Sequence, residues 1–389
     1  MKHKICFIVQ RYGKEVNGGA ELQCREMAQR MCARYQEVHV LTTKAIDYMT
    51  WKDAYQTDEE VLNGVRVHRF SVAHPRNQDE FNAINAKFLS AGISEAEEYD
   101  WMEKQGPAVP DLIARLKKEK DFFDAFIFFT YLYYPTAMGI REVREKAILV
   151  PEAHEEPFLK MKLFEHVFRA PRFFFFNTPE EQQLVCRRFP GLPVSCEIGG
   201  FGIEPPDATD ADGFKKKYGL DEFLLYVGRV DEGKNCHILF QYFKEYKKRN
   251  KNKLKLVLVG KPVIPVPKDP DIVSLGFVEE QEKYNGIAAA QMLVLPSAFE
   301  SLSIVVLEAM SLSVPVVVNG ACSVLKGHCE KSNGALYYED YFEFEGAVNY
   351  IRSHPETVSE MCANAKKYVE ANYSWERIEN KLSSLIERL

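Results

Sequence analysis

The sequence predicts an α/β protein in which two doubly wound, Rossmann-like parallel sheets follow one another along the chain. Short apolar runs alternate with amphipathic segments over most of the 389 residues. Several of these runs are apolar on both faces, which is typical of parallel strands covered by helices. A loop rich in Gly, Pro and Asp, residues 197–213, interrupts the rhythm once, and the strand–helix alternation restarts after it.

The interruption divides the chain into two halves, each long enough for a core of its own. We place an N-terminal domain at residues 1–200 and a C-terminal domain at 201–370. Residues 371–389 form a separate C-terminal segment, because the sequence from Tyr373 onward reads as one amphipathic helix with no strand after it.

The expected strands are short apolar runs. They are residues 5–9, 38–42, 65–70, 125–129, 147–151 and 172–176 in the first half, and 224–228, 254–260, 292–296 and 315–319 in the second. The first expected helix carries one apolar stripe, formed by Ala20, Cys24, Met27, Ala28 and Met31. Two long polar segments, 46–64 and about 73–110, do not fit this rhythm. We interpret them either as substrate loops or lids or as surface decoration, and give both equal weight.

The composition excludes several classes of protein. A formal net charge of −6 argues against a dedicated nucleic-acid binder, and no apolar run approaches the length of about eighteen residues that spans a bilayer. Nine cysteines without a C-x-x-C pair are typical of free thiols in a reducing cytoplasm. The basic cluster 115–120 and the stripe Phe81, Ile84 and Phe88 leave peripheral contact with the inner membrane face open. We favour a core role for the stripe and solvation for the lysines.

The stretch FESLSIVVLE, residues 299–308, has a carboxylate near each end. It follows an expected strand and begins a helix, which is the geometry in which α/β proteins hold phosphates. Glu300 would lie at the helix mouth, and Glu308, about a turn and a half inside, could reach a ligand hydroxyl at the same end. The equally weighted alternative is that Glu308 bonds a neighbouring backbone group or arginine and that Glu300 faces the helix dipole.

Two cations follow the first expected strand of the second half. Gly228 ends that strand, and Arg229 and Lys234 come directly after it. A departing diphosphate accumulates negative charge, which a planar guanidinium and a compact ammonium can neutralise. Solvated surface cations are the alternative, and the position at the carboxyl end of a strand favours function.

The first half offers weaker candidates at the ends of its strands. Gly18 and Gly19 open a helix and permit close approach of a ligand, although a plain turn also explains them. His154 follows another strand and borders the expected crevice. The hydroxyls of Tyr131 and Tyr133 could line a sugar site, whereas core packing explains at least half of this aromatic cluster.

Together these motifs resemble the family 4 retaining glycosyltransferases, which have the GT-B fold. The matching elements run through nearly the whole chain: NGGAE (17–21), GVRVHRF (64–70), AHEEP (153–157), NTPEEQ (177–182), GGFGIE (199–204), GRVDEGKN (228–235) and the block 276–318. The block is the most specific, because Pro-Ser precedes its two glutamates and Ala-Met and Pro-Val follow them. The chain departs from the family at Gln291, where Asp is frequent, and at Ser313, where Gly is frequent.

The resemblance implies roles for the individual residues. Arg229 and Lys234 would neutralise the donor diphosphate, Glu300 would contact the donor sugar, and Glu308 would hold the nucleotide ribose. His154 would contact the transferred sugar or the acceptor. The remaining donor contacts would come from backbone: Gly18, Gly19, Gly228 and the amides of Ser301, Leu302, Ser303 and Ile304.

The same resemblance implies the activity. A hexose-type sugar would move from a UDP- or GDP-sugar to a hydroxyl of a saccharide or lipid-linked saccharide, by front-face displacement in a central cleft between the domains. The final helix would cross back onto the N-terminal domain. Such a transferase would serve the synthesis of cell-surface polysaccharide or glycoconjugate.

No metal cofactor is expected for this reaction. The chain has two Asp-x-Asp pairs, 210–212 and 269–271, which we interpret as a helix cap and part of a proline-broken loop. Two other functions were weighed. One is a catalytically weak nucleotide-sugar-binding subunit that partners another transferase. The other is a Rossmann oxidoreductase, whose G-x-G-x-x-G spacing NGGAELQC lacks.

Overall fold

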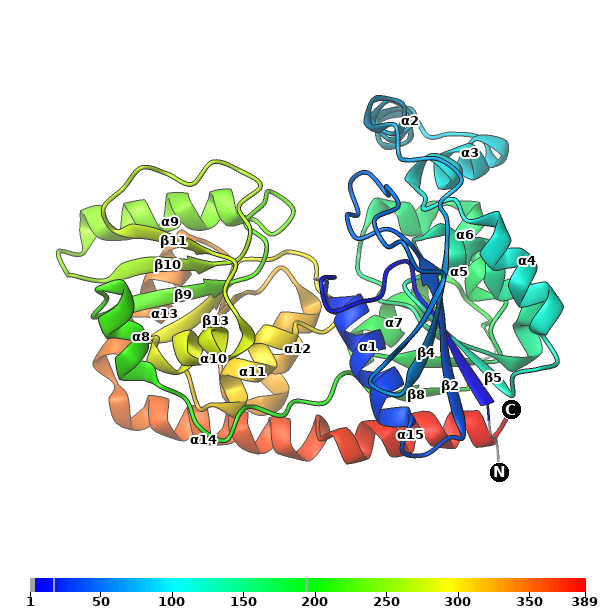
Figure 1. Ribbon diagram of the computed structural model, residues 1–389. Helices are drawn as coiled ribbons and strands as arrows, with labels where there is room; N and C mark the ends of the chain where they lie inside the picture. Colours follow the sequence, from blue (N-terminus) through cyan, green and yellow to red (C-terminus); the bar gives the residue numbers. More distant parts are fainter. Residues whose placement is uncertain (1–3, 17, 193–194) are drawn as a thin grey trace. The chain divides into compact units, whose positions relative to one another are not determined.

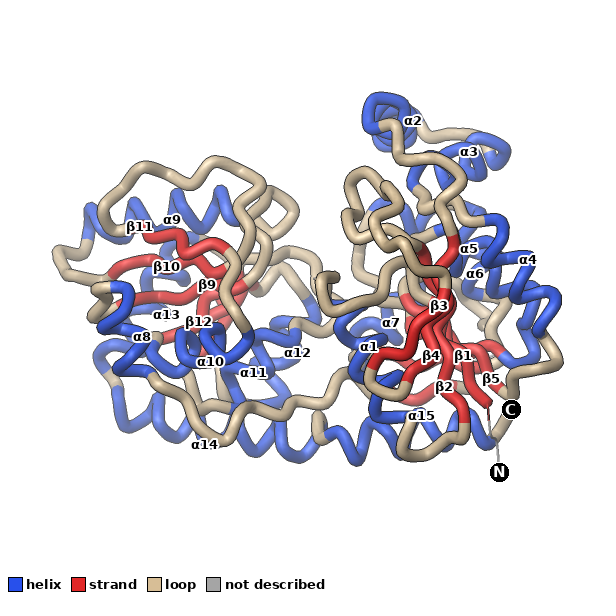
Figure 2. The backbone as a smooth tube through the Cα atoms, viewed as in Figure 1, coloured by secondary structure: helices blue, strands red, loops and turns tan. Residues whose placement is uncertain are grey.

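The computed structural model of the protein describes residues 4–16, 18–192 and 195–389 (Figure 1). It divides into two compact units, unit 1 with Met1–Gly200 and Glu376–Leu389, and unit 2 with Phe201–Trp375. Figure 2 shows a sheet in each unit with helices around it. The α/β class predicted from the alternating pattern is therefore confirmed. Asn17, the first residue of the expected glycine loop, lies outside the described residues.

The sheet of unit 1 has eight strands. Their order is β3 (Glu59–Leu62), β4 (Val65–Phe70), β2 (Glu37–Thr43), β1 (Lys4–Ile8), β5 (Ala125–Phe129), β6 (Ala147–Val150), β7 (Phe173–Phe176) and β8 (Cys196–Ile198). All neighbours are parallel except β3 and β4, which pair antiparallel. The expectation of a purely parallel sheet is therefore wrong at this edge. The pattern missed β3 because its residues are mostly exposed and two of its four are glutamates.

The helices of unit 1 lie around the sheet. They are α1 (Gly19–Met31), α2 (Gln78–Ala91), α3 (Glu95–Gln105), α4 (Pro110–Glu119), α5 (Tyr134–Gly139), α6 (Lys162–Phe168) and α7 (Pro179–Arg188), with the 3₁₀ helices η1 (Ile140–Lys146) and η2 (Pro157–Lys160). Two of them, α2 and α3, lie beyond the end of the sheet (Figure 1). In α1 the predicted stripe is buried except for the partly exposed Ala20. Residues 73–110 fold into α2 and α3. Phe81, Ile84 and Phe88 pack against the core there, which confirms the core interpretation of that stripe.

The sheet of unit 2 has six parallel strands. Their order is β11 (Ile272–Gly276), β10 (Lys255–Val259), β9 (Phe223–Val227), β12 (Met292–Leu295), β13 (Val316–Asn319) and β14 (Leu336–Tyr338). The central strands were predicted, because they are almost wholly buried apolar runs. The edge strands β11 and β14 were missed, since both are partly exposed and lack that signal.

The helices of unit 2 lie around its sheet as well (Figure 1). They are α8 (Ala211–Tyr218), α9 (Cys236–Arg249), α10 (Glu280–Ala289), α11 (Ile304–Ser311), α12 (Ser323–Ser332), α13 (Tyr341–Ser353) and α14 (Pro355–Asn372). The predicted tail helix is α15 (Trp375–Glu387), which contributes Glu376 onward to unit 1. Ile378, Leu382, Leu385 and Ile386 are buried there. Arg34 of unit 1 donates to Glu379 over 2.9 Å, which helps to hold the helix in place.

Each sheet has a point at which the direction of winding reverses. The chain of unit 1 runs from β1 outward through β2 to β4, then crosses to β5 on the other side of β1. In unit 2 it runs from β9 through β10 to β11, then crosses to β12 on the other side of β9. Ligands of open α/β sheets bind at such reversals, beyond the carboxyl ends of the strands. The pairs β1/β5 and β9/β12 therefore locate the candidate sites.

The described residues also answer the questions about disulfides and membrane-spanning helices. All nine cysteines are free thiols, and six of them are buried. No helix in the described part of the chain combines the length and the apolar character needed to cross a membrane.

Candidate active site

The candidate site of unit 2 begins where β9 and β10 end in glycines. Gly228 has φ 149° and Gly260 has φ 136°, a backbone region that residues with a side chain rarely adopt. A Cβ atom on Gly260 would lie 2.0 Å from the carbonyl oxygen of Gly228. The absence of a side chain at Gly260 therefore lets the two strand ends approach, and it fixes the direction in which Arg229 leaves the sheet.

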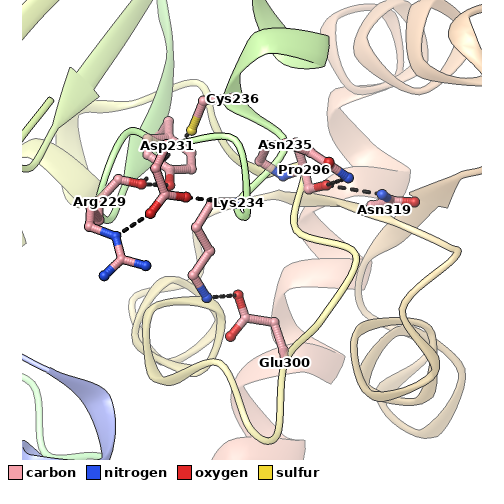
Figure 3. Close-up of polar contacts among 9 residues, drawn as sticks. Arg229, Asp231, Lys234, Asn235, Cys236, Pro296, Glu300 and Asn319 are labelled. Carbon is pink, nitrogen blue, oxygen red and sulfur yellow. Dashed lines mark hydrogen bonds and ion pairs between the residues drawn. The ribbon is translucent and has the colours of Figure 1, made fainter. Parts of the chain in front are cut away.

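Asp231 accepts hydrogen bonds from both residues that carry the predicted cations (Figure 3). Its carboxylate accepts a hydrogen bond from Nε of Arg229 and another from the backbone N–H of Lys234, over 2.8 Å. The hydroxyl of Tyr226 donates to the carbonyl oxygen of Arg229 over 2.6 Å. No sequence motif singled out Asp231. The local sequence could have indicated it, because an Asp side chain commonly accepts a hydrogen bond from a backbone N–H two or three residues later.

Lys234 and Glu300 meet across the reversal between β9 and β12. Nζ of Lys234 donates to Oε1 of Glu300 over 2.7 Å, and the two residues come from the loops that follow the two strands. The Lys234 side chain is 31% exposed and that of Glu300 is 13% exposed. The structure thus unites two residues that the sequence placed separately. A cation and a carboxylate therefore lie side by side at the edge where a ligand is expected.

The backbone of Pro296 connects the surrounding loops through hydrogen bonds. Its carbonyl oxygen accepts hydrogen bonds from Nδ2 of Asn235, over 3.2 Å, and from Nδ2 of Asn319, over 2.9 Å. Asn235 precedes α9 with φ 55°, in the left-handed region that Asn tolerates better than most residues. The end of β12 is therefore fastened to the start of α9 and to the end of β13, which limits movement of the loop carrying Glu300.

The loop 301–303 leads into α11 through a left-handed residue. Ser303 precedes the helix with φ 67°, and α11 begins at Ile304. The carbonyl oxygen of Leu302 lies 2.8 Å from Nε2 of His328, whose ring is fully buried. Burial lowers the pKa of His328 to about 4, so the neutral ring donates to Leu302. The first amides of α11 lack intrahelical acceptors and are available to an anion, as the sequence predicts for this segment.

Glu308 lies inside α11 and is 4% exposed. Its Oε1 accepts from Nζ of Lys283 over 2.6 Å and from the hydroxyl of Tyr284 over 3.1 Å. Both partners belong to α10. The alternative weighed from the sequence named a neighbouring backbone group or an arginine, and the partner is instead a lysine with a tyrosine. Nothing in the sequence pattern singled out Lys283 or Tyr284.

In unit 1, the loop after β1 carries a buried ion pair. Glu21 accepts from Nε and Nη2 of Arg11, over 2.9 and 2.6 Å, and from Nε2 of Gln10, over 2.9 Å. A Cβ atom on Gly18 would lie 2.1 Å from Oε2 of Glu21, whereas one on Gly19 would meet nothing within 4 Å. Gly18 thus makes room for a side chain of unit 1 itself, and its predicted ligand contact stays a prediction, as does that of Gly19.

The other candidates of unit 1 follow β5 and β6. His154 is half-buried, and its Nδ1 lies 3.8 Å from Oε1 of Glu156. The same Glu156 oxygen accepts from the hydroxyl of Tyr131 over 2.6 Å, and burial raises the pKa of this carboxyl. Tyr131 itself is fully buried, which fits the core-packing alternative, and its contact with a sugar stays a prediction. Tyr133 remains partly exposed, and burial raises its pKa to about 12.

The two Asp-x-Asp pairs have structural partners. Asp210 accepts from the backbone N–H of Gly213 and caps α8, as predicted. Asp269 accepts from the backbone N–H of Asp271, and Asp271 pairs with Lys247 over 3.1 Å. Within residues 4–16, 18–192 and 195–389, no group of three or more His, Cys, Asp or Glu side chains is arranged to hold a metal ion.

The class of protein follows from this fold and from sequence comparison. Residues 221–352 match the family described as glycosyl transferases group 1. This range contains all the residues of the candidate site in unit 2. Solved GT-B glycosyltransferase structures cover the full chain, so the predicted GT-B fold is confirmed. Together the family match, the glycosyltransferase relatives and the GT-B neighbours support a GT-B glycosyltransferase, in agreement with the resemblance that the motifs carry.

Individual relatives are distant. An uncharacterized glycosyltransferase of Methanocaldococcus jannaschii is 24% identical over 400 residues, covering 96% of this chain and 95% of that protein. The alpha-D-kanosaminyltransferase of Streptomyces kanamyceticus is 26% identical over 191 residues, covering 45% of this chain and 48% of that protein. Anabaena HepE, solved with UDP and glucose, superposes with a TM-score of 0.74 at 16% identity and full coverage of both chains. Sucrose-phosphate synthase of Thermosynechococcus elongatus gives 0.74 at 15% identity, covering 100% of this chain and 99% of that one.

Proposed function

We propose that the protein is a retaining hexosyltransferase that uses a nucleoside diphosphate sugar and acts without a metal ion. Its acceptor would be a hydroxyl group of a saccharide or a lipid-linked saccharide. The observation that carries the proposal is the Lys234–Glu300 pair at the reversal between β9 and β12, with Arg229 linked to Lys234 through Asp231. Glycosyl transfer to a hydroxyl from such a donor releases a diphosphate, and Arg229 and Lys234 would neutralise its charge.

The proposed reaction is the front-face displacement that the family resemblance implies. The acceptor hydroxyl attacks the anomeric carbon on the face from which the diphosphate leaves, and the bond between that carbon and the phosphate oxygen breaks. The proton of the hydroxyl passes to the departing phosphate oxygen, so the products are a glycoside of unchanged anomeric configuration and a nucleoside diphosphate. The chain supplies positioning and charge stabilisation, which are sufficient to account for a large part of a transferase rate.

The pairing of Lys234 with Glu300 suits both roles proposed for them. In the absence of donor, the ammonium and the carboxylate satisfy one another. A bound diphosphate would compete for the ammonium, and the carboxylate would then accept hydrogen bonds from sugar hydroxyls. Unit 1 would bind the acceptor, with His154 and Tyr133 as the contact candidates at the carboxyl edge of its sheet.

A thermal-shift screen against UDP-, GDP- and ADP-sugars identifies the donor, since a ligand that binds the folded state raises the unfolding temperature. UDP-glucose is the first donor to test, because structures of the same fold contain it. Release of nucleoside diphosphate is then followed by chromatography, and the anomeric configuration of the product by NMR. Donor binding without turnover, with any saccharide acceptor tested, would favour the catalytically weak subunit instead. An inverted product would contradict retention.

A further inference from the structure

Glu308 carries a buried charge whose partners hold only one of its two oxygens. Lys283 and Tyr284 both donate to Oε1, over 2.6 and 3.1 Å. Within the described residues no donor is bonded to Oε2, and this oxygen is not among the fully enclosed polar atoms that lack a partner. Oε2 therefore keeps some solvent contact and an unused capacity to accept a hydrogen bond.

The two donors have different effects on the carboxylate. Lys283, whose side chain is 19% exposed, supplies the opposite charge that a carboxylate in the apolar helix α11 requires. Tyr284 fixes the orientation, because burial and the nearby Glu308 charge raise the pKa of its hydroxyl and keep it protonated. The residues are consecutive in α10, and Nζ of Lys283 lies 4.5 Å from the centre of the Tyr284 ring.

We propose that Lys283 and Tyr284 are positioning residues for the nucleotide ribose of the donor. By occupying Oε1 they leave Oε2 of Glu308 in a fixed direction, where it accepts a hydrogen bond from a ribose hydroxyl. This inference rests on the proposed function, since it assumes a nucleoside diphosphate in the site of unit 2. Its consequence is selectivity: the site binds ribonucleoside diphosphates more tightly than the analogue that lacks the contacted hydroxyl.

The experiment measures binding of the 5′-diphosphates of uridine, guanosine and adenosine, each with its 2′-deoxy and 3′-deoxy analogue, by calorimetry on the full chain. The variants are Lys283→Met and Tyr284→Phe, with Lys283→Arg as the conservative change. Lys217→Met is the matched control, because Lys217 pairs over 2.8 Å with Glu282, on the same helix α10, and does not contact Glu308.

Wild-type protein should bind the preferred ribonucleotide at least about tenfold more tightly than one of its deoxy analogues, as a charged hydrogen bond warrants. Lys283→Met and Tyr284→Phe should weaken ribonucleotide binding and leave deoxynucleotide binding nearly unchanged, so that the ratio falls toward one. Lys283→Arg should restore most of the ratio, and Lys217→Met should keep it in full. A purely structural role would lower all affinities alike and leave the ratio intact.

Two other outcomes distinguish the positioning role of Lys283 and Tyr284 from the proposed function. If wild-type protein binds ribonucleotides and both deoxy analogues equally, or if Lys283→Met and Tyr284→Phe both keep the wild-type ratio, the positioning role is overturned while donor binding stands. If wild-type protein binds none of the three diphosphates, the proposed function itself is overturned. Should Lys283→Met fail to fold, Tyr284→Phe decides the question, because removing one hydroxyl preserves the packing of the ring.

Discussion

Nζ of Lys234 lies 2.7 Å from Oε1 of Glu300, although 66 residues separate the two in the chain. The loops that carry them follow β9 and β12, the adjacent strands between which the winding of unit 2 reverses. The pair therefore occupies the position at which an open α/β sheet binds its ligand. Both side chains retain some exposure, 31% for Lys234 and 13% for Glu300, so a charged ligand could reach the pair.

If the protein has the proposed function, Lys234→Ala should reduce kcat by roughly 10²–10³-fold, because one donor to the developing diphosphate charge would be lost. The free energy of unfolding should change by no more than about 1 kcal/mol, as for other partly exposed pairs. Steady-state kinetics and urea unfolding measure the two effects. Lys326→Ala, which removes a 3.0 Å pair with Glu339 in the same unit, is the control and should leave kcat unchanged. Near-normal turnover in Lys234→Ala would contradict the site assignment.

Asp231→Ala should act on both cations at once. Its carboxylate, on a residue 9% exposed, accepts from Arg229 and from the Lys234 backbone, and its loss leaves those donors without this acceptor. We expect a fall in kcat/KM of at least tenfold and a loss of about 1–3 kcal/mol in unfolding free energy. Asp231→Asn should recover most of the stability and less of the activity, because its amide oxygen still accepts but carries no charge. Full activity in Asp231→Ala would show that the cations are placed without it.

Gly260→Ala should distort the end of β9. The added Cβ atom would meet the Gly228 carbonyl at 2.0 Å, in a backbone region that already costs a residue with a side chain about 1–3 kcal/mol. We expect the free energy of unfolding to fall by at least that amount, measured by calorimetry. Turnover, measured as release of nucleoside diphosphate, should fall as well. Gly346→Ala is the matched control, since its Cβ would meet nothing within 4 Å in helix α13. The control should be neutral or slightly stabilising, and equal behaviour of the two variants would refute the argument.

His328 should make unit 2 sensitive to acid. Burial lowers its folded pKa from 6.5 to about 4, so between these values the unfolded chain binds more protons than the folded chain. Stability therefore rises with pH across this window, and it falls by up to about 1.4 kcal/mol per unit as pH drops from about 6 toward 4. Urea unfolding at pH 7, 6 and 5 should show a shallower slope in His328→Gln. The exposed His354→Gln should keep the wild-type slope, and identical slopes in all three proteins would exclude this role.

The central strands and the two site loops were predictable from the sequence. Buried parallel strands such as β5 and β9 are continuous apolar runs, and loops at their carboxyl ends carry the chemistry in open α/β sheets. Arg229, Lys234 and Glu300 were found by that rule alone. The edge strands β3, β8, β11 and β14 were not, because a partly exposed strand of three to five residues carries little hydrophobic signal.

The sequence by itself determined the α/β alternation, the division into two halves, the family resemblance and the separate positions of the cations and the carboxylates. Tertiary structure decided which of these residues meet. Lys283 and Tyr284 reach Glu308 from another helix, and Asp231 joins Arg229 to Lys234 through a turn. Periodicity reports which face of an element is buried, whereas side-chain pairing depends on the packing of elements distant in the chain. That is why the partners of the site emerged only from the folded protein.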